Sequence, residues 1–284
     1  MSVKRFLAGL ALCLPFAAHA GLTIQHWLTP QGARVLFVEN PALPMLDIAV
    51  GFPAGSARDP AGKPGLAALT HRLLDQGAGG LSDTEIAHRL ADVGAVLGGS
   101  FDRDRAGVSL RTLSSEAEKT AALDVLVRVL HTPDFPKAVV SREKKRLIAG
   151  IREAEADPGS VADKAFYKVL YGTQAYAHDP AGDPVAIETL TRTDLAAFYR
   201  VHYSAPNAVI ALIGDVDRGE AERIATRISA GLPSGKVLPS LPKMSANAPG
   251  TVRIDHPSAQ SHVLVGAVGV ARNDPDFFPL YVGN

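Results

Sequence analysis

The stretch Asp194-Leu-Ala-Ala-Phe-Tyr-Arg-Val-His-Tyr-Ser-Ala-Pro-Asn207 decides the fold of this chain. It predicts a helix that ends in a short Pro-Asn connection, and a strand is predicted to follow at once over residues 208–216. The next helix, 217–231, is predicted to begin with the pair Asp217-x-x-Glu220. This order of helix, connection, strand and helix is far more specific than any single glycine pattern.

Upstream of this block, strands are predicted in consecutive pairs and helices in runs. Arg34–Glu39 is β-branched and aromatic, as buried strands are. The capping boxes Ser82-x-x-Glu85 and Ser115-x-x-Glu118 are expected to open two helices. This grouping predicts an α+β fold. The predicted strands are 22–27, 33–39, 46–52, 95–100 and 106–113, and the predicted helices are 82–93, 115–131 and a long one through 155.

One hairpin is predicted with the charged residues 102–105 at its turn. Its second strand, 106–113, alternates apolar and polar positions. We expect Val108, Leu110 and Leu113 to face the core.

The block 194–216 resembles a landmark of the insulinase-like zinc peptidases, the M16 family, whose helix ends in F-Y-x-x-x-Y-x-P-x-N before a strand with V-G-D-[VI]. Residues 259–266 resemble that family's S-Q-x-x-[IL]-x-x-G, and Gly55, Ser56 and Asp59 match its G-S-x-x-[DE] loop. The resemblance implies an α+β domain with a mostly antiparallel sheet, helices packed on one face, and the start of a second homologous domain.

The stretch Gly65-Leu-Ala-Ala-Leu-Thr-His-Arg-Leu-Leu-Asp-Gln-Gly77 resembles the active-site helix of these peptidases. Their H-x-x-E-H motif supplies two histidine ligands for zinc and a glutamate that polarises the attacking water. Here the ligand positions fall on Ala68 and Arg72, and the glutamate position holds His71. The third ligand position, on the helix that contains Glu143, falls on Gly150. The resemblance therefore implies a degenerate motif with no catalytic residue, no metal and no cofactor.

Elementary chemistry supports this interpretation. The Ala68 methyl group cannot ligate a metal, and the Arg72 guanidinium is a cation without a lone pair to offer. We predict that Arg72 pairs with Glu143 instead, so that an ion pair replaces zinc as the link between the two helices. We also hypothesise that Gly150 reflects close packing.

His71 and Asp75 are four residues apart, which on a helix gives them a common face. Two ligands fall short of a zinc site. We therefore favour a polar edge on an otherwise apolar helix over a metal site.

Residues 1–20 predict a secretory signal peptide. Lys4 and Arg5 precede the apolar run 6–17, and Ala18-His19-Ala20 supplies small residues for cleavage. Cys13 is the only cysteine and lies inside this signal, so the mature chain needs no disulfide. We expect a periplasmic protein, with an extracellular location as the alternative.

After the signal, we expect an N-terminal domain over 21–233 and a linker over 234–250, which is rich in Pro, Ser and Gly. Residues 251–284 are expected to begin a second domain, with strands at 251–256 and 261–268. We expect most of that second domain to lie beyond Asn284.

The composition excludes some classes of partner. Lys and Arg number 29, as do Asp and Glu, and 46% of residues are hydrophobic, which suits a globular chain. A nucleic-acid site needs a clustered basic face. The one basic run, 142–146, is predicted to be a solvated helix face. We expect no nucleic-acid partner and no membrane span in the mature chain.

The resemblance implies a function as well as a fold. We expect the non-catalytic subunit of a heterodimeric M16 metallopeptidase, which helps its H-x-x-E-H partner to bind peptide substrate by strand addition. One alternative is a peptide- or protein-binding scaffold without any peptidase role, because a fold does not fix a function. The other is an active metallopeptidase that uses different ligands.

Overall fold

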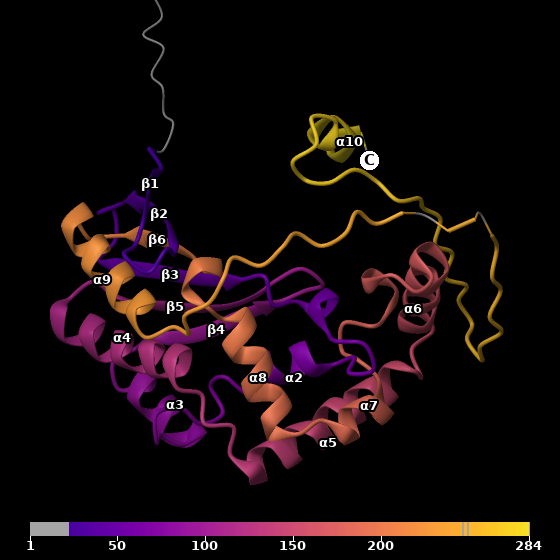
Figure 1. The fold of residues 1–284 in the computed structure, drawn as a ribbon, viewed down its shortest axis with the longest axis horizontal. Helices are drawn as coiled ribbons and strands as arrows, with labels where there is room; N and C mark the ends of the chain where they lie inside the picture. The colour runs from indigo at the N-terminus through magenta and orange to yellow at the C-terminus, as the bar shows by residue number, and fades with distance from the viewer. Residues whose placement is uncertain (1–22, 246, 249, 284) are drawn as a thin grey trace, which may run out of the picture.

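A six-stranded sheet in the order β1-β2-β6-β3-β5-β4 forms the centre of the fold (Figure 1). The computed structural model describes residues 23–283 except 246 and 249, so the predicted signal peptide lies outside the described residues. All neighbouring strands are antiparallel except β2 and β6, which run parallel. The strands are β1 (Gln25–Leu28), β2 (Arg34–Glu39), β3 (Met45–Phe52), β4 (Val96–Phe101), β5 (Ala106–Leu113) and β6 (Val209–Gly214).

Helices cover one face of this sheet, as α3, α4 and α8 do in Figure 1. The α-helices are α2 (Leu66–Arg72), α3 (Asp83–Ala91), α4 (Glu116–His131), α5 (Lys137–Ala154), α6 (Pro158–Tyr171), α7 (Pro184–Thr189), α8 (Arg192–His202), α9 (Arg218–Ala230) and α10 (Phe277–Gly283). Short 3-10 helices are η2 (Ser56–Arg58), η3 (Ala175–Ala177) and η4 (Ala205–Asn207). The predicted α+β class, with a mostly antiparallel sheet and helices on one face, is confirmed.

The alternation of side chains along the strands produces this one-sided packing. In β3 every second residue, from Leu46 to Phe52, is buried against the helices, and the residues between them point to the other face. That other face stays accessible, since Leu36 of β2 and Ile213 of β6 are about two-fifths exposed, at 42% and 38%. The core therefore lies between the sheet and its helices.

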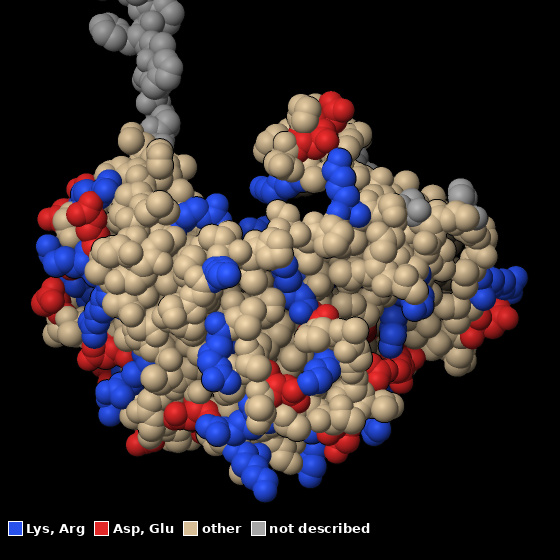
Figure 2. All heavy atoms as spheres, in the orientation of Figure 1, with Lys and Arg blue, Asp and Glu red and all other residues tan. Residues whose placement is uncertain are grey.

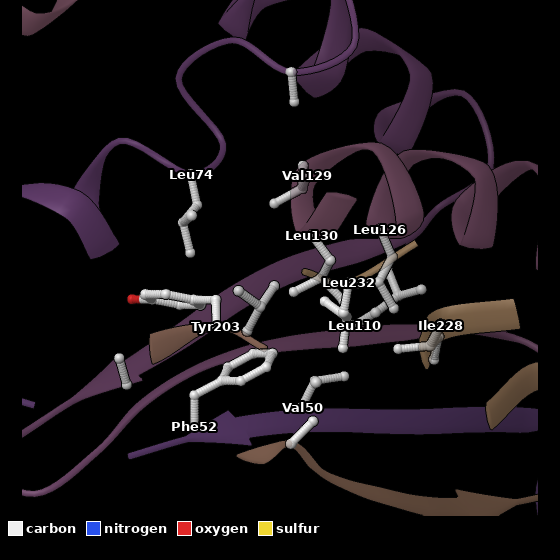
Figure 3. Close-up of a cluster of buried hydrophobic side chains, with 14 of the residues drawn as sticks. Val50, Phe52, Leu74, Leu110, Leu126, Val129, Leu130, Tyr203, Ile228 and Leu232 are labelled. Carbon is white, nitrogen blue, oxygen red and sulfur yellow. The ribbon is translucent and has the colours of Figure 1, made fainter. Parts of the chain in front are cut away.

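The block that decides the fold lies at the middle of this core. Helix α8 ends at His202, and Tyr203 behind it is fully buried, with its ring 4.9 Å from the ring of Phe52 on β3 (Figure 3). The turn η4 then leads directly into β6, which lies between β2 and β3. The Pro-Asn connection thus carries the chain from the helical layer into the centre of the sheet.

Several local predictions are confirmed. Ser82 and Glu85 form a complete capping box at the start of α3, and Asp217 accepts a hydrogen bond from the backbone N–H of Glu220 at the start of α9. The turn at residues 102–105 is also present, closed by backbone and Asp102 side-chain hydrogen bonds.

Two local predictions are wrong. Ser115 is the N-cap residue of α4, which ends at His131 as predicted, but the capping box is not formed, because the Ser115 hydroxyl donates to the Glu118 side chain and accepts no backbone N–H among the described residues. Leu113 does not face the core and is 41% exposed, because residues 108, 110 and 112 share one face of β5 and an odd-numbered residue must point away. Thr112 takes the buried position instead.

The predicted strands 251–256 and 261–268 are absent, since the described residues of this region form no strand. The segment runs beside α6, where Asn247 donates to the Val169 carbonyl, and ends in α10, which stands apart from the body of the molecule (Figure 1). Its apolar side chains are largely exposed, for example Val263 at 81%. A strand needs a hydrogen-bonding neighbour, and no strand of the described sheet flanks this segment.

The surface carries both signs of charge. On the face seen in Figure 2, Lys and Arg alternate with Asp and Glu and do not gather into one basic face. In the part of the chain that the structure describes, no helix has the length and apolar character needed to cross a bilayer.

Candidate functional site

Helix α2 carries the three motif positions, and a network of backbone contacts fixes its N-terminus. Asp59 accepts hydrogen bonds from the backbone N–H groups of Gly65 and Ala67, at 2.7 Å each. Gly65 has φ +98°, a conformation that favours glycine. The backbone of Gly182 packs directly on Gly65, so closely that a Cβ at Gly182 would lie 2.4 Å from the Gly65 Cα. The loop before α7 therefore determines where α2 begins.

A groove of about 550 Å³ lies between α2, α5 and the edge strand β4. Its lining includes Ala68, His71, Arg72, Gly99, Phe101 and Glu143. A second hollow, of about 610 Å³, shares Arg72, Arg146 and Leu147 with the first and extends past Gly150 toward α6. The two hollows form one continuous surface, and the structure brings all four predicted site positions to it.

Arg72 and Glu143 form the predicted link between α2 and α5. The Arg72 Nε donates to the Glu143 Oε2 at 2.9 Å, and the Glu143 side chain is 2% exposed. A charge taken out of water needs a partner, and the guanidinium supplies both the opposite charge and the hydrogen bond. The predicted ion pair is confirmed.

Two further arginines bind the same carboxylate. Arg142 Nε donates to Glu143 Oε1 at 3.0 Å, and Arg146 Nη1 donates to the same oxygen at 2.9 Å. Burial acts to raise the pKa of Glu143, but the hydrogen bonds from Arg72 and Arg142 and the charge of Arg146 outweigh it and lower the pKa. Glu143 is therefore ionised at neutral pH.

The prediction that the basic run 142–146 is only a solvated helix face is therefore wrong. Arg142 also binds Asp83 and Gln76, and Lys144 donates to the backbone carbonyls of Glu188 and Leu190 on the α7 side. The sequence signal that could have revealed this is the spacing of Glu143 and Arg146, three residues apart on α5, since such pairs meet on one helix face.

His71 contacts the edge strand. Its ring stacks on Phe101 with ring centres 5.6 Å apart and planes 15° from parallel, and it lies over Gly99, where a Cβ would come within 3.0 Å of the ring. Burial lowers the pKa of His71 although the charge of Asp75 opposes this, so the imidazole is neutral at pH 7. Asp75 lies beyond the end of α2 at Arg72. Sequence reasoning missed Gly99 and Phe101 as groove residues, because only the sheet topology brings β4 beside α2.

The hypothesis of close packing at Gly150 is wrong. A Cβ at this position would meet no atom within 4 Å, and Gly150 lines the open second hollow. Glycine in a helix interior costs about 1 kcal/mol relative to alanine. Among the residues that the structure describes, no packing contact accounts for Gly150.

His178 ties the loop around η3 to the N-terminal support of α2. Its Nε2 donates to the Ser56 carbonyl at 2.9 Å and lies 3.5 Å from the Asp59 carboxylate. The hydrogen bond to Asp59 raises the pKa of His178, against the opposing effect of burial. A histidine whose pKa is raised on folding stabilises the fold fully below its unfolded pKa, about 6.5, and this contribution is lost as pH rises through the folded value.

We therefore expect His178→Ala to lower the free energy of unfolding more at about pH 5.5 than at about pH 8.5. Urea unfolding of both proteins at the two pH values measures the difference. The exposed His26→Ala is the control for loss of a histidine. An equal loss at both pH values would show that the His178–Asp59 contact does not depend on the charge of the imidazole.

Comparison with known proteins places this chain in a family. The model described as insulinase (peptidase family M16) matches residues 34–183, which is more than half of the chain. The chain belongs to the M16 peptidase family. The model described as the peptidase M16 inactive domain matches residues 189–284, so the chain also contains the start of a C-terminal M16 domain.

Individual relatives agree with this assignment. A crystal structure described as the peptidase M16 inactive domain from Pseudomonas fluorescens is 39% identical, with a TM-score of 0.77, and the alignment covers 79% of this chain and 54% of that one. An uncharacterized zinc protease of Streptomyces coelicolor is 25% identical over 89% of this chain and 56% of its own length. A probable mitochondrial-processing peptidase subunit beta of Arabidopsis thaliana is 25% identical over 89% of this chain and 48% of its own. This M16 chain thus spans about half the length of these relatives.

Proposed function

We propose that this M16 protein is the non-catalytic subunit of a heterodimeric periplasmic metallopeptidase. In this proposal it binds extended peptide in the groove between α2, α5 and β4, and a partner with an intact H-x-x-E-H motif hydrolyses the peptide. The observation that carries the proposal is the Arg72–Glu143 ion pair, which occupies the site where the family resemblance expects a metal.

The residues at the expected ligand positions do not fit zinc. Ala68 offers a methyl group, Gly150 has no side chain, and Arg72 presents a cation whose Nε is already bound to Glu143. Neutral His71 is stacked on Phe101, and a single imidazole is not a zinc site. Among the residues that the structure describes, no three His, Cys, Asp or Glu side chains gather to hold a metal ion. We therefore derive no hydrolytic step in this chain.

The edge strand supports peptide binding. β4 pairs with β5 along one side, and within the described sheet its other side has no neighbour. An extended peptide can add to such an edge through main-chain hydrogen bonds. Gly98 and Gly99 leave the middle of β4 without side chains, beside the groove that holds Arg72. An added strand would therefore lie along the groove.

The subunit role is supported by the plant relative, which is named as a subunit of a processing peptidase. The periplasmic location is proposed from the signal-like residues 1–20.

Peptidase assays with an unstructured peptide test this proposal. We expect no cleavage by this protein alone and chelator-sensitive cleavage when an H-x-x-E-H homologue from the same organism is added, well above the cleavage by that homologue alone. Chelator-sensitive cleavage by this protein alone would contradict the proposal. No added cleavage in the mixture would favour the binding scaffold instead.

A further inference from the structure

Two guanidinium groups at the junction of the two hollows are only partly engaged. Arg72 uses its Nε to bind Glu143, and Arg146 uses its Nη1. Among the described residues, neither guanidinium has another hydrogen-bond acceptor or a second carboxylate. Their side chains are 49% and 60% exposed, and both line the two hollows. Each therefore has N–H groups that remain open to a ligand.

The groups bonded directly to Glu143 favour an anion between Arg72 and Arg146. Arg142, the third arginine on Glu143, is balanced by Asp83. The single charge of Glu143 is then shared between Arg72 and Arg146, which leaves one positive charge in excess within this cluster. Glu143 is buried, and its hydrogen bonds hold the guanidinium groups of Arg72 and Arg146 in place. A guanidinium that is already held loses less conformational freedom when it binds a planar carboxylate.

Four other acidic groups line the two hollows, and three of them accept hydrogen bonds from neutral neighbours, which hold these carboxylates in place without cancelling their charge. Asp75 accepts a hydrogen bond from Gln76, Asp157 from the backbone of Ser160, and Asp179 from the backbone of Ala181. Asp163 and Lys164 on α6 both line the second hollow. Arg103 covers the Tyr167 ring at 3.5 Å and adds a cation to that hollow. None of these acids forms an ion pair with Arg72 or Arg146.

We infer that Arg72 and Arg146 together bind the carboxylate of an acidic peptide that lies along β4. This inference rests on the proposed peptide-binding function and names the class of peptide. A peptide carboxylate can come from an Asp or Glu side chain or from the peptide C-terminus, and both offer the same two oxygens to the guanidinium N–H groups. The groove thus selects for negative charge at the point where a catalytic relative is expected to hold its metal.

The test uses fluorescein-labelled peptides of alternating Thr and Val, about as long as a typical strand. One carries a central Glu and an amidated C-terminus, the second has Gln in place of Glu, and the third has the Gln with a free C-terminal carboxylate. Fluorescence anisotropy measures their binding to the full chain, to Arg146→Ala and to Arg227→Ala. Arg227 is the matched control, because it also pairs with one carboxylate, Asp124, but lies on α9 away from both hollows.

We expect at least one carboxylate-bearing peptide to bind about 10-fold more tightly than the neutral peptide, and Arg146→Ala, but not Arg227→Ala, to remove this difference. The preference should also weaken as salt is added. If the peptide with the central Glu binds more tightly than the neutral peptide, the bound carboxylate is that of a side chain. If the peptide with the free C-terminus does, it is the C-terminal carboxylate. Arg146→Ala leaves the Arg72–Glu143 link in place, and its thermal unfolding reports whether the variant is folded.

Equal binding of all three peptides, or a preference that survives Arg146→Ala, would overturn this inference and leave the proposed function intact. Binding of none of them would contradict peptide binding itself, and the inference with it.

Discussion

Tyr203→Ala is expected to lower the free energy of unfolding by about 3–5 kcal/mol, the usual cost of removing a large aromatic side chain from a core. Tyr203 is fully buried, and its ring lies 4.9 Å from Phe52 and 5.6 Å from Tyr199, centre to centre. Figure 3 shows it among side chains of β3, β5 and α4, so its removal leaves a cavity inside the core. Urea unfolding followed by circular dichroism measures the loss.

Tyr203→Phe separates the ring from its hydroxyl group. Among the described residues the Tyr203 hydroxyl has no hydrogen-bond partner, whereas the Tyr199 hydroxyl donates to the Leu130 carbonyl at 2.6 Å. We therefore expect Tyr203→Phe to leave stability unchanged or raise it, and Tyr199→Phe to lower it by about 1 kcal/mol. A large loss on Tyr203→Phe would mean that the hydroxyl has a partner, such as a buried water, and that the ring is not the main contribution.

Gly182→Ala is the second substitution with a large expected effect, about 2–4 kcal/mol. Gly182 has φ +98°, and a Cβ there would lie 2.4 Å from the Gly65 Cα and 2.7 Å from the Gly65 nitrogen. Both contacts are backbone atoms that cannot rotate away, so the N-terminus of α2 must shift. We expect a loss of stability in urea and, because α2 carries Arg72, weaker peptide binding.

Gly62→Ala is the matched control. Gly62 also has a positive φ, +77°, but a Cβ there would meet nothing within 4 Å. This variant should show only the cost of the left-handed conformation, about 1–2 kcal/mol, and unchanged peptide binding. Equal losses at the two glycines would refute the idea that the Gly182–Gly65 contact positions α2.

Much of the fold could be predicted from the sequence because its signals are local. The Ser82–Glu85 capping box and the alternation of β3 each depend on residues within a few positions of one another. The prediction for Leu113 was wrong because it followed the apolar character of the residue. The two-residue period of the strand, which places 108, 110 and 112 on one face, puts Leu113 on the other.

The site could be predicted only in part. The pairing of Arg72 with Glu143 could be predicted from the sequence. The zinc ligands of the motif are replaced but the acid Glu143 is kept, so this acid needs another partner. The role of Phe101 could not be predicted, since it depends on where β4 lies in space. The Glu143–Arg146 pair was missed although its three-residue spacing on one helix was visible in the sequence. The prediction of close packing at Gly150 was wrong because a glycine indicates close packing only where another residue lies near it. Among the described residues, none lies within 4 Å of a Cβ at this position.

The position of β6 has a consequence for how the chain folds. β6 separates β2 from β3, so the β1–β2 hairpin has no place in the sheet until the segment 209–214 has been synthesised. These residues belong to the second of the two matched segments, which begins at residue 189. Pairings between distant parts of a chain form slowly, and strand edges that are still unpaired are prone to aggregation. A nascent or truncated chain that ends at the first matched segment therefore has two incomplete half-sheets, and we expect it to aggregate more readily than a chain that includes β6.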